Sequence, residues 1–226
     1  MGEGSFMSTY CMRRISVKEL SRGVLIAFEG IDGSGKTTQI EKIARLLRKH
    51  TYPVTVTHEP NHNSKWGQLI QKKVKKHREE VTPEVELEWY LKDREWDLNQ
   101  NILPALEQKH IVLVDRYYLS NAAYQGALDI FSPEYVLQKN SFAQKPDLWI
   151  LLDVTVQLGQ SRIRERDKQN EDQLELADYQ EKVRQNYKQL AKMDIGGKIE
   201  WVDASGEEEE LTQILTNLIL EFLKEF

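Results

Sequence analysis

The sequence predicts an α/β fold in which a five-stranded parallel sheet lies between two layers of helices. Five apolar runs have the length and composition of strands, and a helical pattern separates each run from the next. Strands that alternate with helices form parallel sheets, because each crossover helix packs back onto the sheet. The predicted strands are, in chain order, Val24–Glu29, Val54–His58, Ile111–Asp115, 148–154 and Lys198–Asp203.

Residue types at the helix ends predict where several helices begin. Thr82-Pro83-Glu84 and Ser132-Pro133-Glu134 each offer a capping hydroxyl, a proline at the first helical position and an early acid. A helical pattern also covers Lys36–Lys49. At the end of the chain, an apolar stripe at helical spacing over 211–220 follows four glutamates at 207–210, which favour a helix N-terminus.

The composition is that of one globular domain. The chain has 226 residues, of which 40% are hydrophobic, and this is enough for one substantial core. We expect the domain over 23–226 and a flexible leader over 1–22. The 31 basic and 36 acidic side chains give a net charge of −5, so a nucleic acid bound through a general positive field is not an expected partner.

The single cysteine and the short apolar runs indicate in which cell compartment the protein is expected. Cys11 alone cannot form an intramolecular disulfide or a cysteine-based zinc site, and such cysteine usage is typical of the reducing cytosol. No apolar run approaches the roughly twenty residues that cross a bilayer. We therefore expect a cytoplasmic protein with no membrane partner.

The segment between the first strand and the first helix matches the phosphate-binding P-loop pattern. It reads Gly30-Ile31-Asp32-Gly33-Ser34-Gly35-Lys36-Thr37-Thr38. The glycines let backbone N–H groups face phosphate oxygens, the Lys36 ammonium lies near the β- and γ-phosphates, and the Thr37 hydroxyl ligates Mg²⁺. The sequence therefore predicts a P-loop NTPase fold that binds ATP with Mg²⁺ as cofactor.

Polar residues also end the other predicted strands, at the edge where open parallel sheets bind ligands. His58-Glu59-Pro60-Asn61 end the second strand, and Asp115-Arg116-Tyr117 end the third. The planar fork of Arg116 suits the phosphate of an acceptor molecule. Asp115 either binds metal-linked water or holds Arg116, and a purely structural pair of these two residues is the alternative.

These motifs resemble, in order, those of the thymidylate kinase family, which moves the ATP γ-phosphoryl group onto dTMP. The resemblance rests on the P-loop, on Asp93-Arg94, on Asp115-Arg116-Tyr117 with the Ser-Asn-Ala-Ala-Tyr-Gln-Gly run at 120–126, and on Lys145-Pro146-Asp147. It covers roughly residues 22–226. It implies a three-layer α/β/α fold with a small lid at about 160–175, ATP and dTMP as substrates, and a homodimer formed by helices beside the sheet.

The resemblance assigns residues to the acceptor's base. It implies that Tyr90 stacks on the pyrimidine and that Arg94, one helical turn later, binds a base carbonyl. Asn121 would donate to or accept from the N3 edge. Ordinary core packing is the alternative for Tyr90, because aromatic residues at helical spacing are usually core.

Other residues are assigned to the sugar and phosphate of the acceptor. The resemblance implies that Tyr124 presses against the sugar 2′ position, that Asp32 accepts from the 3′-hydroxyl, and that Gln125 belongs to the same site together with Arg116. Glu59 is also included, because Glu59-Pro60 followed by Trp66 resembles deoxynucleoside kinases, whose catalytic base is such a glutamate.

The catalytic charges are expected from the P-loop, the third strand and the lid. Members of the family carry an arginine either inside the P-loop or in the lid. Gly33 and Ser34 occupy the P-loop positions here, so the resemblance implies that Arg162 and Arg166 of the lid join Lys36 and Arg116 as catalytic residues. Arg164 is a weaker candidate, and a solvated charged helix is the alternative for this segment.

The second-strand loop departs from the bacterial family pattern. His58-Glu59-Pro60-Asn61-His62-Asn63 lacks the arginine and both glycines that are common there. The acceptor site is therefore open to other interpretations: a deoxynucleoside kinase, a kinase for another pyrimidine monophosphate, or a non-catalytic P-loop protein that binds nucleotide.

Overall fold

The computed structural model describes residues 18–74, 77–166 and 174–226 and contains the predicted five-stranded parallel sheet, in the order β2-β3-β1-β4-β5. Every neighbouring pair in this order is parallel. The strands are β1 (Val24–Glu29), β2 (Val54–His58), β3 (Ile111–Asp115), β4 (Leu148–Asp153) and β5 (Lys198–Asp203). The predicted bounds are confirmed for four strands, and β4 ends one residue earlier than predicted.

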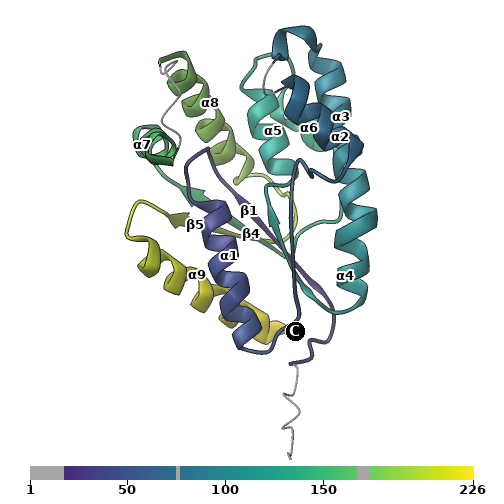
Figure 1. Cartoon of the computed structure of the whole chain (residues 1–226), viewed down its shortest axis with the longest axis vertical. Helices are drawn as coiled ribbons and strands as arrows, with labels where there is room; N and C mark the ends of the chain where they lie inside the picture. Colours follow the sequence, from purple (N-terminus) through teal and green to yellow (C-terminus); the bar gives the residue numbers. More distant parts are fainter. Residues whose placement is uncertain (1–17, 75–76, 167–173) are drawn as a thin grey trace, which may run out of the picture.

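Helices cover both faces of the sheet and gather beyond the carboxyl ends of its strands (Figure 1). On one face α1 (Lys36–Lys49) packs beside α9 (Glu208–Phe222), and on the other α4 (Leu103–Glu107) contacts β3. The remaining helices are α2 (Lys65–Leu69), η1 (Ile70–Val74), η2 (Arg78–Glu80), α3 (Pro83–Asp97), η3 (Leu98–Ile102), α5 (Tyr118–Gly126), α6 (Pro133–Lys139), α7 (Val156–Arg166), α8 (Leu174–Leu190) and η4 (Leu223–Glu225). None of the described helices is long and apolar enough to span a membrane.

The capping residues begin helices where the sequence predicts. The Thr82 hydroxyl accepts from the backbone N–H of Val85 at the start of α3, and the Ser132 hydroxyl accepts from that of Tyr135 at the start of α6. Each side chain satisfies a donor that the first helical turn leaves unpaired. The first turn of α9 carries three glutamates, as expected for a helix N-terminus.

Helices α3 and α4 are joined by a π-helical turn without a break in the helix. α3 leads directly into η3, a π-helical turn, and then into α4, which has Pro104 in its first turn. Proline has no N–H and its ring crowds the preceding turn, and a wider π-helical turn accommodates that crowding. The helix can therefore run from the acceptor region to the sheet without ending.

Residues 18–22, the last part of the expected leader, contact the rest of the chain. Leu20 is buried in the core, and the backbone N–H of Ser21 donates to the carbonyl of Phe226 at 2.8 Å. Arg22 holds both carboxylate oxygens of Asp147, at 2.8 and 3.1 Å. The burial of Leu20 and these contacts fix the segment, whereas residues 1–17, with Cys11, lie outside the described part of the chain.

Candidate active site

The P-loop holds its lysine inside a ring of acceptors. Lys36 Nζ donates to the carbonyls of Gly30 and Ile31 at 3.0 and 2.9 Å and to Ser34 Oγ at 3.1 Å. Burial, together with the nearby charge of Arg116, lowers the pKa of Lys36 to about 8. The ammonium is therefore already placed where an anion in the cleft would contact it.

Gly33 brings the P-loop against helix α7. Its φ is +77°, and a Cβ atom at this position would lie 2.1 Å from the carbonyl oxygen of Gly159. Both the backbone conformation and the space therefore require glycine. This contact also explains the absence of a P-loop arginine at this position.

We expect Gly33→Ala to lower the free energy of unfolding by more than about 1–2 kcal/mol, the cost of the left-handed backbone alone. The clash with Gly159 adds to that cost. Thermal unfolding would measure the change, with Gly206→Ala as the matched control, because a Cβ at Gly206 meets nothing within 4 Å. Equal melting temperatures for the two variants would contradict the packing described here.

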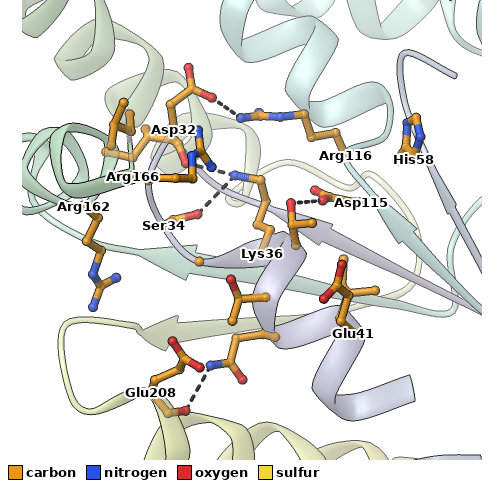
Figure 2. A pocket seen from close by; sticks show the side chains of 18 of the residues that line it. Asp32, Ser34, Lys36, Glu41, His58, Asp115, Arg116, Arg162, Arg166 and Glu208 are labelled. Carbon is orange, nitrogen blue, oxygen red and sulfur yellow. Dashed lines mark hydrogen bonds and ion pairs between the residues drawn. The ribbon is translucent and has the colours of Figure 1, made fainter. Parts of the chain in front are cut away.

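A cleft of about 1010 Å³ extends from the P-loop across the carboxyl ends of β2 and β3 to α7 and the start of α9. Figure 2 shows Lys36, Asp115, Arg116 and Arg166 facing this space. The first residues of α1 lie on its wall, so the positive end of that helix points into it. These features make the cleft suitable for a phosphorylated nucleotide.

Arg116 is fixed by contacts from the P-loop and from helix α5. It has a positive φ of 65°, and Nη2 donates to the Asp32 carboxylate and, at 3.2 Å, to the Tyr124 hydroxyl. Nη1 donates to Ser120 Oγ at 3.1 Å. Burial opposes ionisation of Asp32, but the charges of Arg116 and Lys36 hold the pKa of Asp32 below its usual value.

Asp115 pairs with the P-loop and not with Arg116. The Thr37 hydroxyl donates to the Asp115 carboxylate, while the carboxylate partner of Arg116 is Asp32. The structural Asp115–Arg116 pair considered from the sequence is therefore not the arrangement found. A hydroxyl and a carboxylate side by side at the cleft are oxygen donors of the kind that Mg²⁺ prefers.

Asp32 is also held by helix α8. Gln180 Nε2 donates to the Asp32 carboxylate at 2.9 Å, and the Asp32 backbone N–H donates to Gln180 Oε1 at 3.4 Å. In parallel, the Tyr179 hydroxyl donates to the backbone carbonyl of Tyr124 at 2.9 Å. Neither Tyr179 nor Gln180 is expected at the site from the sequence, because both lie in a polar stretch of α8 with no distinctive spacing.

A second group of predicted residues forms a buried polar cluster beside the cleft. Arg94 is 1% exposed and donates to the carboxylate of Glu59, to Asn140 Oδ1 and, at 3.4 Å, to Asn121 Oδ1. Its guanidinium also lies 5.4 Å from the centre of the Tyr117 ring. Glu59 lines the cleft as well, so it joins the cleft to this cluster.

The charges of the cluster do not balance. Burial raises the pKa of Glu59 well above its usual value; Arg94 opposes the shift, and Asp97 and Asp93 add to it. Asp93 accepts from the backbone N–H of Asn61 at 2.9 Å, and Asp97 accepts from the Thr57 hydroxyl at 2.7 Å. Arg94 is therefore the cation that contacts Glu59, while Asp93 and Asp97 add negative charge around that carboxylate.

Four buried side-chain atoms lack hydrogen-bond partners in the described part of the chain. They are Glu59 Oε1, Arg94 Nε, Asn121 Nδ2 and Gln125 Oε1. Folded proteins rarely leave such atoms unpaired, because each costs free energy when buried. All four belong to residues that the sequence places in the acceptor site, and together they offer donors and acceptors to a ligand.

The remaining acceptor residues, Tyr90, Tyr124 and Gln125, are not on the cleft wall. Gln125 Nε2 donates to Glu86 at 2.6 Å, and Glu86 also receives two hydrogen bonds from Arg78. Tyr90 is half-buried on α3, and burial raises its pKa. The Tyr124 ring lies 4.9 Å from the Arg116 guanidinium. The structure therefore holds Gln125 through Glu86 and Tyr124 through Arg116.

The lid arginines point in different directions. Arg162 donates to the backbone carbonyl of Ala204 at 3.0 Å, so it faces the β5–α9 turn and not the P-loop. Arg166 lies beside Asp32 in Figure 2. The expected lid spans about 160–175, of which 167–173 lie outside the described residues. The structure brings Arg166, but not Arg162, to the P-loop.

Known proteins are similar to this sequence over most of its length. A family model described as thymidylate kinase matches residues 28–214. A probable thymidylate kinase of Archaeoglobus fulgidus is 44% identical over 200 residues, which are 88% of this chain and 96% of that protein. A thymidylate kinase of Desulfotalea psychrophila is 46% identical over 161 residues, which are 71% of this chain and 78% of that protein. The P-loop, the Asp-Arg-Tyr segment and these matches agree, and the chain belongs to the thymidylate kinase family.

Proposed function

We propose that this protein transfers the γ-phosphoryl group of ATP to dTMP, giving dTDP for dTTP synthesis. The observation that carries the proposal is the set of four unpaired buried atoms on Glu59, Arg94, Asn121 and Gln125. A pyrimidine base offers carbonyl oxygens and an N–H group that such atoms can bind. The family match and the relatives named thymidylate kinase support the same acceptor.

The P-loop would bind ATP, and its charges would stabilise the transferred group. Phosphoryl transfer requires positioning and charge neutralisation more than a covalent step on the protein. Lys36 supplies a positive charge from the loop, and Arg116 supplies another across the cleft. Arg166 would add a third positive charge from α7. Arg162 is turned toward the β5–α9 turn, where it donates to the Ala204 carbonyl.

The residues at the cleft fit a magnesium ion. The Thr37 hydroxyl and the Asp115 carboxylate lie together on its wall, and both are hard oxygen ligands. When bound there with ATP, Mg²⁺ would neutralise charge on the phosphate oxygens. Thr37 and Asp115 are therefore the proposed metal residues.

We expect Asp115→Asn to raise the Mg²⁺ concentration needed for half-maximal rate by about 10–100-fold. The amide oxygen is a weaker ligand than the carboxylate, and the hydrogen bond from Thr37 weakens as well. Initial rates at saturating ATP and increasing Mg²⁺ would measure the effect. Asp129→Asn, at an exposed carboxylate that pairs with Lys182, is the control, and the same Mg²⁺ dependence in both variants would refute the assignment.

A deoxynucleoside kinase is less well supported, because the relatives are named thymidylate kinase. Glu59, which would act as the base of such a kinase, accepts from the buried Arg94 through Oε2, and its Oε1 is without a partner. A panel of acceptors with ATP and Mg²⁺ separates the functions. We expect dTDP from dTMP. Phosphorylation of thymidine but not of dTMP would support a nucleoside kinase. Binding of ATP with no phosphoryl transfer to any acceptor would support a non-catalytic protein.

We also propose that the protein is a cytoplasmic homodimer, as the family resemblance implies. Trp89 and Trp96 of α3 are only partly buried in the single chain, so this helix retains apolar surface for a partner copy. Analytical ultracentrifugation would test the assembly. A sedimenting mass equal to that of one chain would refute it.

A further inference from the structure

Glu29, the last residue of β1, is a completely buried carboxylate directly before the P-loop. Its Oε1 accepts from the backbone N–H groups of Tyr117 and Ser120, at 2.9 and 3.2 Å. Its Oε2 accepts from the Ser120 hydroxyl and, at 3.1 Å, from the Tyr187 hydroxyl. Four donors therefore converge on this one buried anion, and three of them lie at the start of α5.

Helix α5 has no capping side chain of its own. Tyr117, which precedes the helix, makes no capping hydrogen bond, and its hydroxyl donates instead to the Gln144 carbonyl at 3.0 Å. Glu29 receives the N–H of Ser120, the third helical residue, which a capping side chain would otherwise bind. A negative charge also suits this end of a helix. Glu29 therefore takes the place of a cap and fixes the start of α5 against β1.

The Ser120 hydroxyl connects Glu29 to Arg116. Its single proton is directed at Glu29 Oε2, so its oxygen presents lone pairs to other groups. Arg116 Nη1 donates to that oxygen at 3.1 Å, and to the carbonyl of Gly30 at 3.3 Å. Gly30 is the residue after Glu29. Both acceptors of Nη1 are therefore held by Glu29, one through its carboxylate and the other through the chain.

The charges around Glu29 agree with these contacts. Burial raises the pKa of Glu29, whereas the hydrogen bonds from Ser120 and Tyr117 and the charge of Arg116 favour its ionised form. The Ser120 hydroxyl donates to the carboxylate and accepts from the guanidinium. A neutral group thus transmits the position of the buried anion to the cation at the cleft.

We propose that Glu29 is a positioning residue that sets the orientation of the Arg116 guanidinium toward the acceptor's phosphate. It acts through Ser120, because it accepts the hydroxyl proton and thereby turns the hydroxyl oxygen toward Nη1. The inference rests on the proposed function, since Arg116 is the proposed ligand of that phosphate. It assigns no contact between Glu29 and a substrate.

The test is Glu29→Gln, alone and together with Arg116→Gln. The amide keeps one oxygen for the two backbone N–H groups but places an NH₂ group where Oε2 accepts from Ser120. A donor then faces the Ser120 oxygen and competes with Arg116 for its lone pairs. We expect kcat/KM for dTMP to fall by about 10–100-fold in Glu29→Gln, with KM for ATP unchanged.

The double variant separates positioning from a structural role. If Glu29 acts through Arg116, replacing Glu29 in the Arg116→Gln protein should change kcat/KM for dTMP by less than about twofold, because no guanidinium is left to orient. A merely structural role would give the same loss in both backgrounds, and this result would overturn the inference. Unchanged kcat/KM in the single variant Glu29→Gln would overturn it as well.

Asp153→Asn is the matched control. It makes the same carboxylate-to-amide change at the end of the neighbouring strand β4, where Asp153 accepts from Arg184 of α8 at 2.6 and 2.9 Å. Asp153 is outside the set of described residues that line the cleft. In this variant we expect kcat/KM for dTMP to equal that of the unmodified protein.

Ser120→Ala provides a second measurement if Glu29→Gln does not fold. It leaves Glu29 with two backbone donors and Tyr187, and removes the hydroxyl that reaches Arg116. We expect kcat/KM for dTMP to fall at least about tenfold in Ser120→Ala but to be unaffected by this change in Arg116→Gln. Equal losses in both backgrounds, while the unmodified protein phosphorylates dTMP, would overturn the inference alone. Failure of the unmodified protein to phosphorylate dTMP would overturn the proposed function and this inference with it.

Discussion

Replacing Arg94 by methionine is expected to lower the free energy of unfolding by about 3–5 kcal/mol, because the buried Glu59 carboxylate would lose its cation. The Glu59–Arg94 pair is almost completely buried, and Asp93 and Asp97 add negative charge around it. For a domain of this size the change corresponds to a fall of roughly 6–20 °C in melting temperature. Thermal and denaturant unfolding would measure it.

The loss of stability in Arg94→Met should depend on pH, and the pKa of Glu59 gives the direction of this dependence. The pKa of Glu59 is raised above its value in the unfolded chain even with Arg94 present, so the native state binds the proton more tightly than the unfolded state does. Stability linked to Glu59 therefore falls as pH rises from the unfolded pKa through the native pKa. In Arg94→Met, where the native pKa is higher still, we expect a larger destabilisation at pH 8 than at pH 5.

A double variant separates stability from function. Arg94→Met with Glu59→Gln removes both charges and should recover most of the lost stability, since a neutral amide is far less costly to bury than an unpaired carboxylate. Activity toward dTMP should not recover, because the proposed base contact is still missing. Arg22→Met, which breaks an exposed pair with Asp147, should change stability by less than about 1 kcal/mol. A double variant as unstable as Arg94→Met would contradict the charge argument.

Replacing Arg116 by glutamine is expected to lower kcat/KM for dTMP by about 10³-fold, the lower end of the effect of an arginine that stabilises a transferred phosphoryl group. Arg116 is held toward the cleft by Asp32, Tyr124 and Ser120. Glutamine keeps some hydrogen bonding but loses the charge and the planar fork. Steady-state rates at varied dTMP and saturating ATP would measure the loss.

The control for this variant is Arg48→Gln, on an exposed part of α1 far from the cleft, which should leave kcat/KM unchanged. Binding of ATP should be affected less than use of dTMP, because the P-loop keeps Lys36 and its backbone donors. If the Arg116→Gln protein retained full activity toward dTMP, the residue would be structural. Loss with dTMP but retention with thymidine would assign Arg116 to the acceptor's phosphate.

Most of the fold follows from local patterns in the sequence. Of the four strands with the predicted bounds, β1 and β3 are buried apolar runs, whereas β2 and β5 are partly exposed edge strands. Thr82 and Ser132 begin helices because their hydroxyls satisfy backbone donors. Leu20 shows the limit of this reasoning. One leucine among polar residues gives no periodic signal, and its burial depends on tertiary contacts with the end of the chain.

The sequence predicts the parts of the candidate site that lie in recognisable motifs. It does not predict the residues that reach the site only through the packing of helices. The P-loop and Arg116 lie at one cleft as expected from the strand ends. Asn140 and Gln180 could not be found, because a polar residue on a helix has no special spacing until the fold brings it to a partner. Arg162 was assigned with Arg166, yet residues four apart on α7 point to different ends of the cleft.

The contact between Gly33 and Gly159 restricts how this sequence can diverge. The two positions lie far apart in the chain, but their backbones touch, so neither can acquire a side chain while the other element stays in place. A P-loop arginine could arise only in a lineage whose α7 had already moved away. We therefore expect positions 33 and 159 to change together among descendants of a common ancestor, and the source of the catalytic charge to change with them.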